Sequence, residues 1–220
     1  MMRALYFVVA MCVLSHSATA AIIVSYVGSN ITAGGFGTVD VMVSSNASSG
    51  TPDNLAFVAA HFRIAPIGSS PAGGLQFVDP QGDSQLTDPN YVFFGNSTGT
   101  SPLGVVSSFA NPNDDYAGGD GTPLGVEIPL HSGLSPYLLF RFNLDATLSN
   151  VGDQYELKLL NDGGTDFWDD ATNSLAFSPV SYAPFTLTAV PEPSTFALMA
   201  LGSAFYYFRR RQPSNASHLV

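Results

Sequence analysis

Carboxylates are the residues of this chain best suited to chemistry, and they gather in two glycine-rich stretches, residues 111–121 and 161–170. Calcium binds six to eight oxygen atoms, which a flexible acidic loop can supply. Neither stretch is an EF-hand loop, because counting from Asn111 places Tyr116 where glycine is needed and Thr122 where glutamate is needed. We expect any calcium to brace a loop; the alternative is a pair of solvated turns rich in Asx residues. The candidate calcium ligands are Asp114, Asp115, Asp120, Asp162 and Asp166.

The same carboxylates could hydrolyse glycosides if two of them faced each other about 5 to 10 Å apart across a cleft. Trp168, which follows Phe167 among the acidic residues, could then form a platform on which a sugar stacks; a buried aromatic pair is the alternative. Residues 95–99 match the G-x-S-x-G pattern of serine hydrolases, with Ser97 as the nucleophile. That pattern needs a helix after the serine, and residues 100–104 cannot begin one, so we interpret the segment as a turn.

Histidine and basic residues are scarce, which excludes several classes of protein. His61 and His131 are the histidines between residues 21 and 190, and no C-x-x-C or H-E-x-x-H motif accompanies them. A zinc or iron site would therefore have few ligands. We expect both residues to be surface or edge-strand histidines. The same region has 3 basic and 16 acidic residues, whereas nucleic-acid binding needs clustered Lys and Arg. Lys158 is the one lysine, and only 11% of the chain is charged, which argues against coiled coils.

The first 20 residues have the order of a secretory signal peptide. Arg3 supplies one positive charge, and residues 4–14 are almost wholly apolar. Ala18 and Ala20 then form an A-x-A peptidase site, so we expect cleavage after Ala20. Cys12, the one cysteine, would leave with this peptide, and the mature domain would depend on its core rather than on a disulfide.

The C-terminal region contains three elements in a fixed order: a Pro-Glu-Pro motif, an apolar stretch of 15 residues at 194–208, and three arginines. As a helix, the apolar stretch would be about 22 Å long, short of the ~30 Å hydrocarbon core, so it could span only with bilayer thinning or snorkelling arginines. The arginines would hold this end in the cytoplasm and leave the preceding domain outside. The motif residues are Pro191, Glu192 and Pro193, and the anchor residues are Arg209, Arg210 and Arg211.

This arrangement resembles the PEP-CTERM sorting signal of Gram-negative bacteria. The resemblance implies an exosortase, a membrane-embedded cysteine protease, as the processing partner. It also implies transient anchoring in the inner membrane through residues 194–208, followed by transfer to the cell envelope or the extracellular matrix. Residues 212–220 form a longer tail than the signal usually has. The alternative is a plain single-span anchor that is never cut, which would leave a permanently membrane-anchored periplasmic protein.

Between the two ends, short stretches of alternating apolar and polar residues are separated by Gly, Pro, Asn and Asp, a pattern typical of strands with one buried face. Ten such strands in about 170 residues indicate an all-β fold, a single antiparallel β-sandwich of cohesin-like or jelly-roll type, flanked by a signal helix and a transmembrane helix. The strand order resembles that of cohesin-like and carbohydrate-binding-module sandwiches. The expected strands are residues 22–27, 37–43, 55–64, 74–78, 91–94, 105–109, 126–130, 137–144, 154–160 and 185–190.

These observations divide the chain into a signal peptide (1–20), an exported β-sandwich domain (21–189), a sorting segment (190–211) and a cytoplasmic tail (212–220). We predict a non-enzymatic structural, adhesive or glycan-binding module of the cell envelope or extracellular matrix, with extracellular polysaccharide as a partner. The alternative function is that of a secreted carbohydrate-active enzyme that uses the loop carboxylates, with or without calcium.

Overall fold

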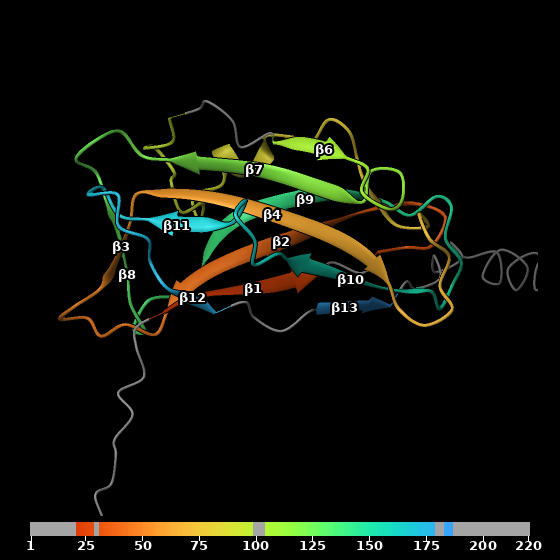
Figure 1. Cartoon of the computed structure of the whole chain (residues 1–220), viewed down its shortest axis with the longest axis horizontal. Helices are drawn as coiled ribbons and strands as arrows, with labels where there is room; N and C mark the ends of the chain where they lie inside the picture. Colours follow the sequence, from red (N-terminus) through yellow and green to blue (C-terminus); the bar gives the residue numbers. More distant parts are fainter. Residues whose placement is uncertain (1–20, 29–30, 99–103, 179–182, 187–220) are drawn as a thin grey trace, which may run out of the picture.

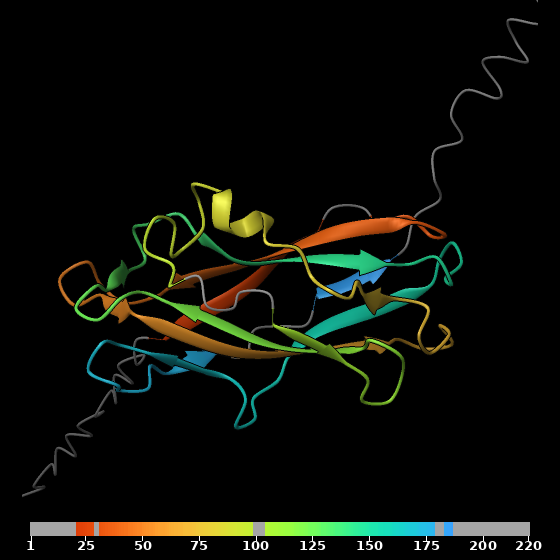
Figure 2. The same cartoon turned by 90° about the horizontal axis from the view of Figure 1, so that it is seen from above.

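The alternating strands build two β-sheets that pack face to face into an elongated sandwich (Figures 1 and 2). The computed structural model describes residues 21–28, 31–98, 104–178 and 183–186. The predicted signal peptide, sorting segment and tail lie outside these residues, and within them no helix is long and apolar enough to cross a membrane. The elements are β1 (Ile22–Gly28), β2 (Phe36–Ser45), β3 (Asp53–Leu55), β4 (Phe57–Pro66), β5 (Gln76–Phe77), the 3-10 helix η1 (Ser84–Thr87), β6 (Val105–Ser107), β7 (Asp115–Gly121), β8 (Ile128–Leu130), β9 (Tyr137–Asp145), β10 (Gln154–Leu159), β11 (Asp166–Trp168), β12 (Phe177–Ser178) and β13 (Ala183–Thr186).

The first sheet has the strand order β12-β1-β2-β9-β5, and the second has the order β13-β10-β4-β7-β6, with β11 also paired to β4. A separate two-stranded ribbon joins β3 to β8. Within the described residues these strand pairs are antiparallel, except that β12 runs parallel to β1 and aligns Phe177 with Ile22. The predicted antiparallel β-sandwich is thereby confirmed, with one short parallel edge strand.

Aromatic rings from both sheets form the centre of the core. Phe140 and Phe142 point inward from β9, and the ring of Phe62 on β4 meets them edge to face, with centroids 5.6 and 5.0 Å away. Tyr116 on β7 packs against Phe142 at 4.7 Å. All four side chains are almost fully buried. Each such burial contributes about 1.5–3 kcal/mol, so this cluster is a main source of cohesion between the sheets.

Two expected strands differ from the structure in kind. The expected strand 55–64 is interrupted at Ala56, where the chain leaves the β3–β8 ribbon and enters the second sheet. The expected strand 91–94 is a turn, in which Tyr91 makes a single bridge to Leu138. Of the last expected strand, residues 185 and 186 belong to β13, and residues 187–190 lie outside the described part of the chain.

Two stretches expected to be loops are instead strands. β7 and β11 consist largely of Gly, Asp and aromatic residues, a composition that favours turns when it is judged from the sequence alone. Gly119 shows how closely β7 lies against β4. A Cβ at this position would lie 2.4 Å from the carbonyl oxygen of Val58 on β4, so the close approach of the two backbones requires glycine. The two-residue strand β12 is also absent from the expected set.

Candidate functional site

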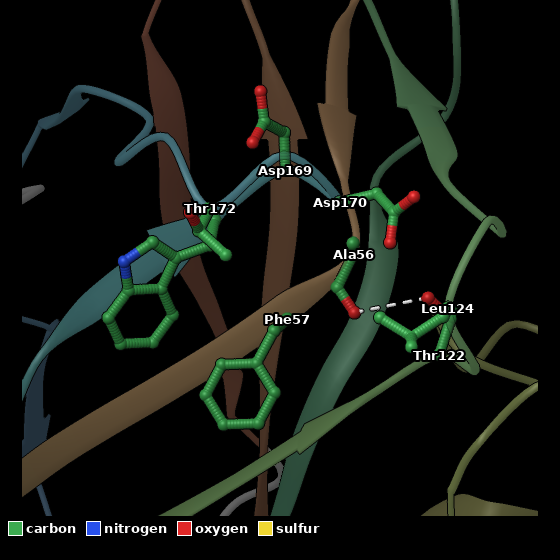
Figure 3. A pocket seen from close by; sticks show the side chains of 8 residues that line it. Ala56, Phe57, Thr122, Leu124, Asp169, Asp170 and Thr172 are labelled. Atoms are coloured by element: carbon green, nitrogen blue, oxygen red, sulfur yellow. Dashed lines mark hydrogen bonds between the residues drawn. The ribbon is translucent and has the colours of Figure 1, made fainter.

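A pocket of about 310 Å³ lies on the outer face of the second sheet, at the end where β4 begins and β7 ends (Figure 3). Three segments that are distant in the sequence form it: the start of β4, the loop after β7, and β11 with the turn that follows it. Its volume is near the lower limit for small-molecule pockets, which is about 300 Å³. The lining residues are Ala56, Phe57, Thr122, Leu124, Trp168, Asp169, Asp170 and Thr172.

Phe57 and Trp168, here called the aromatic pair, form the apolar wall of the pocket. The pairing of β4 with β11 aligns the two residues, and their ring centroids lie 5.1 Å apart with an interplanar angle of 38°. Strand alternation sends their neighbours Val58 and Phe167 into the core, where both are fully buried. Of the two alternatives for Trp168 and Phe167, burial applies to Phe167 alone, and the partner of Trp168 on the outer face is Phe57.

The turn after β11 forms one rim of the pocket and is held by Asp169. Its two carboxylate oxygens accept hydrogen bonds from the side-chain amide and the backbone N–H of Asn173, at 2.8 and 2.7 Å. These hydrogen bonds lower the pKa of Asp169. Thr172 in the same turn has φ of 65°, a left-handed conformation that β-branched residues rarely adopt. The rim is thus a tight and locally strained turn.

Asp170 joins this turn to the loop after β7. Its Oδ2 accepts a hydrogen bond from the N–H of Gly125 at 3.0 Å, and its own N–H donates to Oε1 of Glu127 at 3.0 Å. Figure 3 shows its carboxylate directed toward Thr122 and Leu124, whereas that of Asp169 points away from the ring of Phe57. No donor among the described residues contacts Oδ1 of Asp170. The pocket therefore combines an aromatic wall with one carboxylate oxygen that can accept a hydrogen bond from a ligand.

The carboxylates predicted to bind calcium do not form one site. Asp114 accepts hydrogen bonds from the backbone N–H groups of residues 109–111, at 2.7–3.1 Å, and so closes the turn before β7. Asp166 accepts a hydrogen bond from the hydroxyl of Ser174 at 2.5 Å, at the start of β11. Within the described ranges, no three carboxylate, histidine or cysteine side chains converge in a way that could hold a metal ion. The prediction treated both stretches as flexible loops, whereas the strands β7 and β11 fix these carboxylates at separate places.

Asp115 and Asp162 do come together, on either side of His61. The Nε2 atom of His61 lies 2.7 Å from Asp115, and its Nδ1 atom lies 2.7 Å from Asp162, an arrangement here called the His61 clamp. Arg63 donates a further hydrogen bond to Asp115 at 2.8 Å. Burial acts to lower the pKa of His61, but the hydrogen bonds and negative charges of the two carboxylates outweigh it and raise the pKa. Because the carboxylates contact opposite ring nitrogens, the clamp braces the sheet rather than a shared metal ion.

His61 lies on the interior strand β4 rather than at a sheet edge, and its side chain is partly exposed on the outer face, which fits the surface position of the expectation. The backbone of His61 takes part in the same bracing. Its carbonyl oxygen accepts from the N–H of Leu160, and its N–H donates to the hydroxyl of Thr165. His61 thus fixes the loop that leads from β10 to β11, and β11 carries Trp168 of the pocket.

Asp120 points to the inner side of the second sheet, opposite to Asp115. It is 3% exposed and accepts hydrogen bonds from the hydroxyls of Tyr91 and Ser97, both at 2.6 Å. Ser97 is the serine of the G-x-S-x-G match, and the partner shown for it is a carboxylate rather than the imidazole that activates a serine nucleophile. This geometry agrees with the interpretation of residues 95–98 as a turn; Gly99 lies outside the described residues.

Comparison with known proteins identifies the C-terminal segment. Residues 189–211 match the PEP-CTERM protein-sorting motif. The predicted sorting signal at residues 190–211 is thus confirmed, and the PEP-CTERM segment implies an exosortase-processed protein that is exported to the cell surface or beyond. The sequence matches none of the curated proteins.

The solved structures similar to this chain include cohesin modules, the family that its strand order resembles. The sixth cohesin of Acetivibrio cellulolyticus scaffoldin B has 11% identity and a TM-score of 0.47, over 76% of this chain and 98% of that chain. The type III cohesin of the Ruminococcus flavefaciens ScaE scaffoldin has 11% identity and a TM-score of 0.46, over 84% and 96%. A cohesin module of a Clostridium perfringens family 33 glycoside hydrolase has 11% identity and a TM-score of 0.45, over 78% and 100%.

Proposed function

We propose that the exported domain is a non-enzymatic module that binds polysaccharide of the cell envelope or extracellular matrix through the pocket at the aromatic pair. The observation that carries the proposal is the outward position of Phe57 and Trp168 in that pocket, with Phe57 43% exposed. Pyranose rings have apolar C–H faces and a rim of hydroxyl groups. An apolar aromatic wall with a few polar groups beside it is complementary to such a ring.

The direction of the pocket supports a role outside the cell. Phe57 begins β4, whereas Pro66 at the far end of that strand aligns with Tyr155 on β10. Tyr155 in turn aligns with β13, which ends at Thr186. Ten residues of strand extend about 30 Å, so the pocket and Thr186 lie at opposite ends of the second sheet (Figure 1). A domain held to the membrane through residues 194–208 would therefore present the pocket away from the lipid.

The finer steps of delivery belong to the same proposal. Signal peptidase cuts after Ala20, and Arg209, Arg210 and Arg211 hold the C-terminal end in the cytoplasm. An exosortase then recognises Pro191, Glu192 and Pro193, and the domain passes from the inner membrane to the envelope or matrix. The match of residues 189–211 to the PEP-CTERM protein-sorting motif supports the exosortase step.

Glycoside hydrolysis has weaker support than binding. A general acid needs a carboxyl group whose pKa is raised, so that it holds a proton at neutral pH. At the pocket, hydrogen bonds from Asn173 lower the pKa of Asp169 and occupy both of its oxygens. Asp169 is therefore a structural carboxylate of the turn, not a proton donor.

Intact mass of the protein from the culture medium and the membranes of its own host tests the delivery steps. The expected product in the medium begins at Ala21 and ends between residues 190 and 195. A membrane species that retains Arg211, with no shorter species in the medium, would contradict exosortase processing.

Binding of the secreted protein to polysaccharide isolated from the host's matrix tests the function of the pocket. Trp168→Ala should weaken this binding about tenfold, since it removes half of the aromatic wall. Phe36→Ala is the matched control, because it removes an aromatic side chain that is 67% exposed on the first sheet. Equal binding by the wild-type and Trp168→Ala proteins, with melting temperatures unchanged, would contradict the proposal.

A further inference from the structure

We propose that the pocket selects a sugar that carries a protonated amine, such as the glucosamine unit of a deacetylated polysaccharide, and that Asp170 is the residue that faces the amine. This inference rests on the proposed function and names the class of glycan that the same pocket binds. Four observations on charge, hydrogen bonding and ring geometry support it.

The charge around the pocket has one sign. Asp169 and Asp170 line the pocket. Glu127 belongs to the loop after β7 and Asp166 to β11, which are two of the segments that form the pocket. None of the lining residues is basic. A uronate or a sulfated sugar would meet like charges here, and the excess of acidic over basic residues in the domain would add to the repulsion. A cationic ligand would meet only opposite charges.

The cations of the second sheet are already engaged with other carboxylates, so they do not neutralise the pocket. Arg63 donates to Asp115, and Lys158 pairs with Glu156. His61 lies between Asp115 and a second carboxylate in the His61 clamp. These pairs are separate from the residues that line the pocket. The negative charge of the pocket rim is thus left for a ligand to balance.

The two carboxylates that line the pocket differ in what they can still bind. Both oxygens of Asp169 accept hydrogen bonds from Asn173. Asp170 uses Oδ2 for the N–H of Gly125, and no donor among the described residues contacts its Oδ1. An ammonium group offers three N–H donors and no acceptor, and therefore suits this free oxygen. Asp169 keeps spare lone pairs, but its carboxylate points away from the ring of Phe57 (Figure 3), so Asp170 is the residue placed to bind the amine directly.

The aromatic pair contributes to the same selectivity. A ring face attracts a cation within about 6 Å of its centroid, by about 0.5–1 kcal/mol at an exposed site, which corresponds to about a two- to fivefold gain in affinity. The ring centroids of Phe57 and Trp168 lie 5.1 Å apart at a tilt of 38°, so the two rings pack against each other, and a ligand in the pocket meets the ring faces that the pair leaves uncovered. A sugar that stacks on these faces would bring its amine next to aromatic carbons, where an N-acetyl group or a neutral hydroxyl gains no such attraction.

The test compares two oligosaccharides with the protein secreted by its host: a glucosamine hexamer, at a pH where its amines are protonated, and the N-acetylated hexamer. We expect the glucosamine hexamer to bind about tenfold more tightly, with the preference falling as salt is added. Asp170→Asn keeps an acceptor for Gly125 but removes the charge, and should reduce the preference about threefold. The matched control is Asp83→Asn, which removes one charge from an exposed residue beside η1 that makes no capping hydrogen bond.

Several outcomes would overturn the inference. The two hexamers could bind equally, Asp170→Asn could retain the full preference, or Asp83→Asn could reduce it as much as Asp170→Asn does, which would mean attraction by net charge alone. If neither hexamer binds while the host's polysaccharide still binds through Trp168, the amine is excluded and the proposed function stands. If the host's polysaccharide also fails to bind, the proposed function fails together with the inference.

Discussion

Replacing His61 with glutamine should remove a source of stability that depends on pH. The protonated imidazole donates to Asp115 and Asp162 at 2.7 Å each, and glutamine can reach at most one of them and carries no charge. The pKa of His61 is raised in the folded protein, against the effect of burial, by these two carboxylates. Its contribution is therefore complete below the unfolded pKa of about 6.5 and is lost as pH rises through the higher folded value.

The size of the effect follows from the two contacts. A hydrogen bond between charged groups contributes about 1.5–3 kcal/mol when it is buried, and the bond to Asp115 is of this kind, since the side chain of Asp115 is 11% exposed. The side chain of Asp162 is 43% exposed, so its bond contributes about 0.5 kcal/mol. A total of about 2–3.5 kcal/mol corresponds to a fall in melting temperature of roughly 4–14 °C for a domain of this length.

Thermal unfolding between pH 5 and pH 9, followed by circular dichroism, measures this contribution. Wild-type and His61→Gln proteins should differ most below about pH 6.5 and converge at higher pH, although neutral His61 still donates one hydrogen bond. His131→Gln is the control, because the ring of His131 accepts from the N–H of Gly133 and forms no ion pair among the described residues. Parallel pH profiles for the wild-type and His61→Gln proteins would refute the proposed role of the clamp.

Three further substitutions test the core, the buried carboxylate and the strained turn. Phe142→Ala removes a ring from the aromatic core and should cost about 3–5 kcal/mol, measured as a lower urea midpoint. Asp120→Ala leaves the hydroxyls of Tyr91 and Ser97 without their acceptor and should cost about 1–3 kcal/mol in the same assay; an unchanged midpoint would contradict this. Thr172→Gly relieves a positive φ and should raise the melting temperature by roughly 2–4 °C, whereas a decrease would show that the turn is not strained.

The sequence predicts the fold well where alternation and burial coincide. Val39, Val41 and Val43 alternate with Asp40 and Met42, and all three valines are fully buried in β2. Hydrophobic burial is the dominant free-energy term, so this pattern determines which face of each strand turns inward. The same argument fails at β7, where Gly119 and its neighbours form a strand paired with β4, and the facing backbone leaves no room for a side chain at Gly119. That requirement comes from the tertiary structure and has no local signal.

The candidate site is harder to predict, because its parts come from distant segments. Nearness in the sequence places Asp115 and Asp120 in one group, whereas strand alternation in β7 sends Asp115 outward and Asp120 inward. Phe57 did carry a usable signal. It is apolar but out of phase with Val58 and Phe62, which face the core, so its ring has to point outward. Its pairing with Trp168 depends on the contact between β4 and β11, which single-sequence periodicity does not reveal.

Phe109 shows how this protein uses an outward aromatic ring when the ring is needed for its own structure. It is 68% exposed, and the guanidinium group of Arg63 lies 3.4 Å from its ring centroid. The guanidinium group therefore covers one face of the ring. The same Arg63 side chain bonds to Asp115 in the His61 clamp, so Phe109 belongs to the bracing of the sheet. By contrast, no arginine or lysine among the described residues lies over the rings of the aromatic pair. Phe57 and Trp168 are thus outward aromatic rings whose faces a cationic or sugar ligand can still reach.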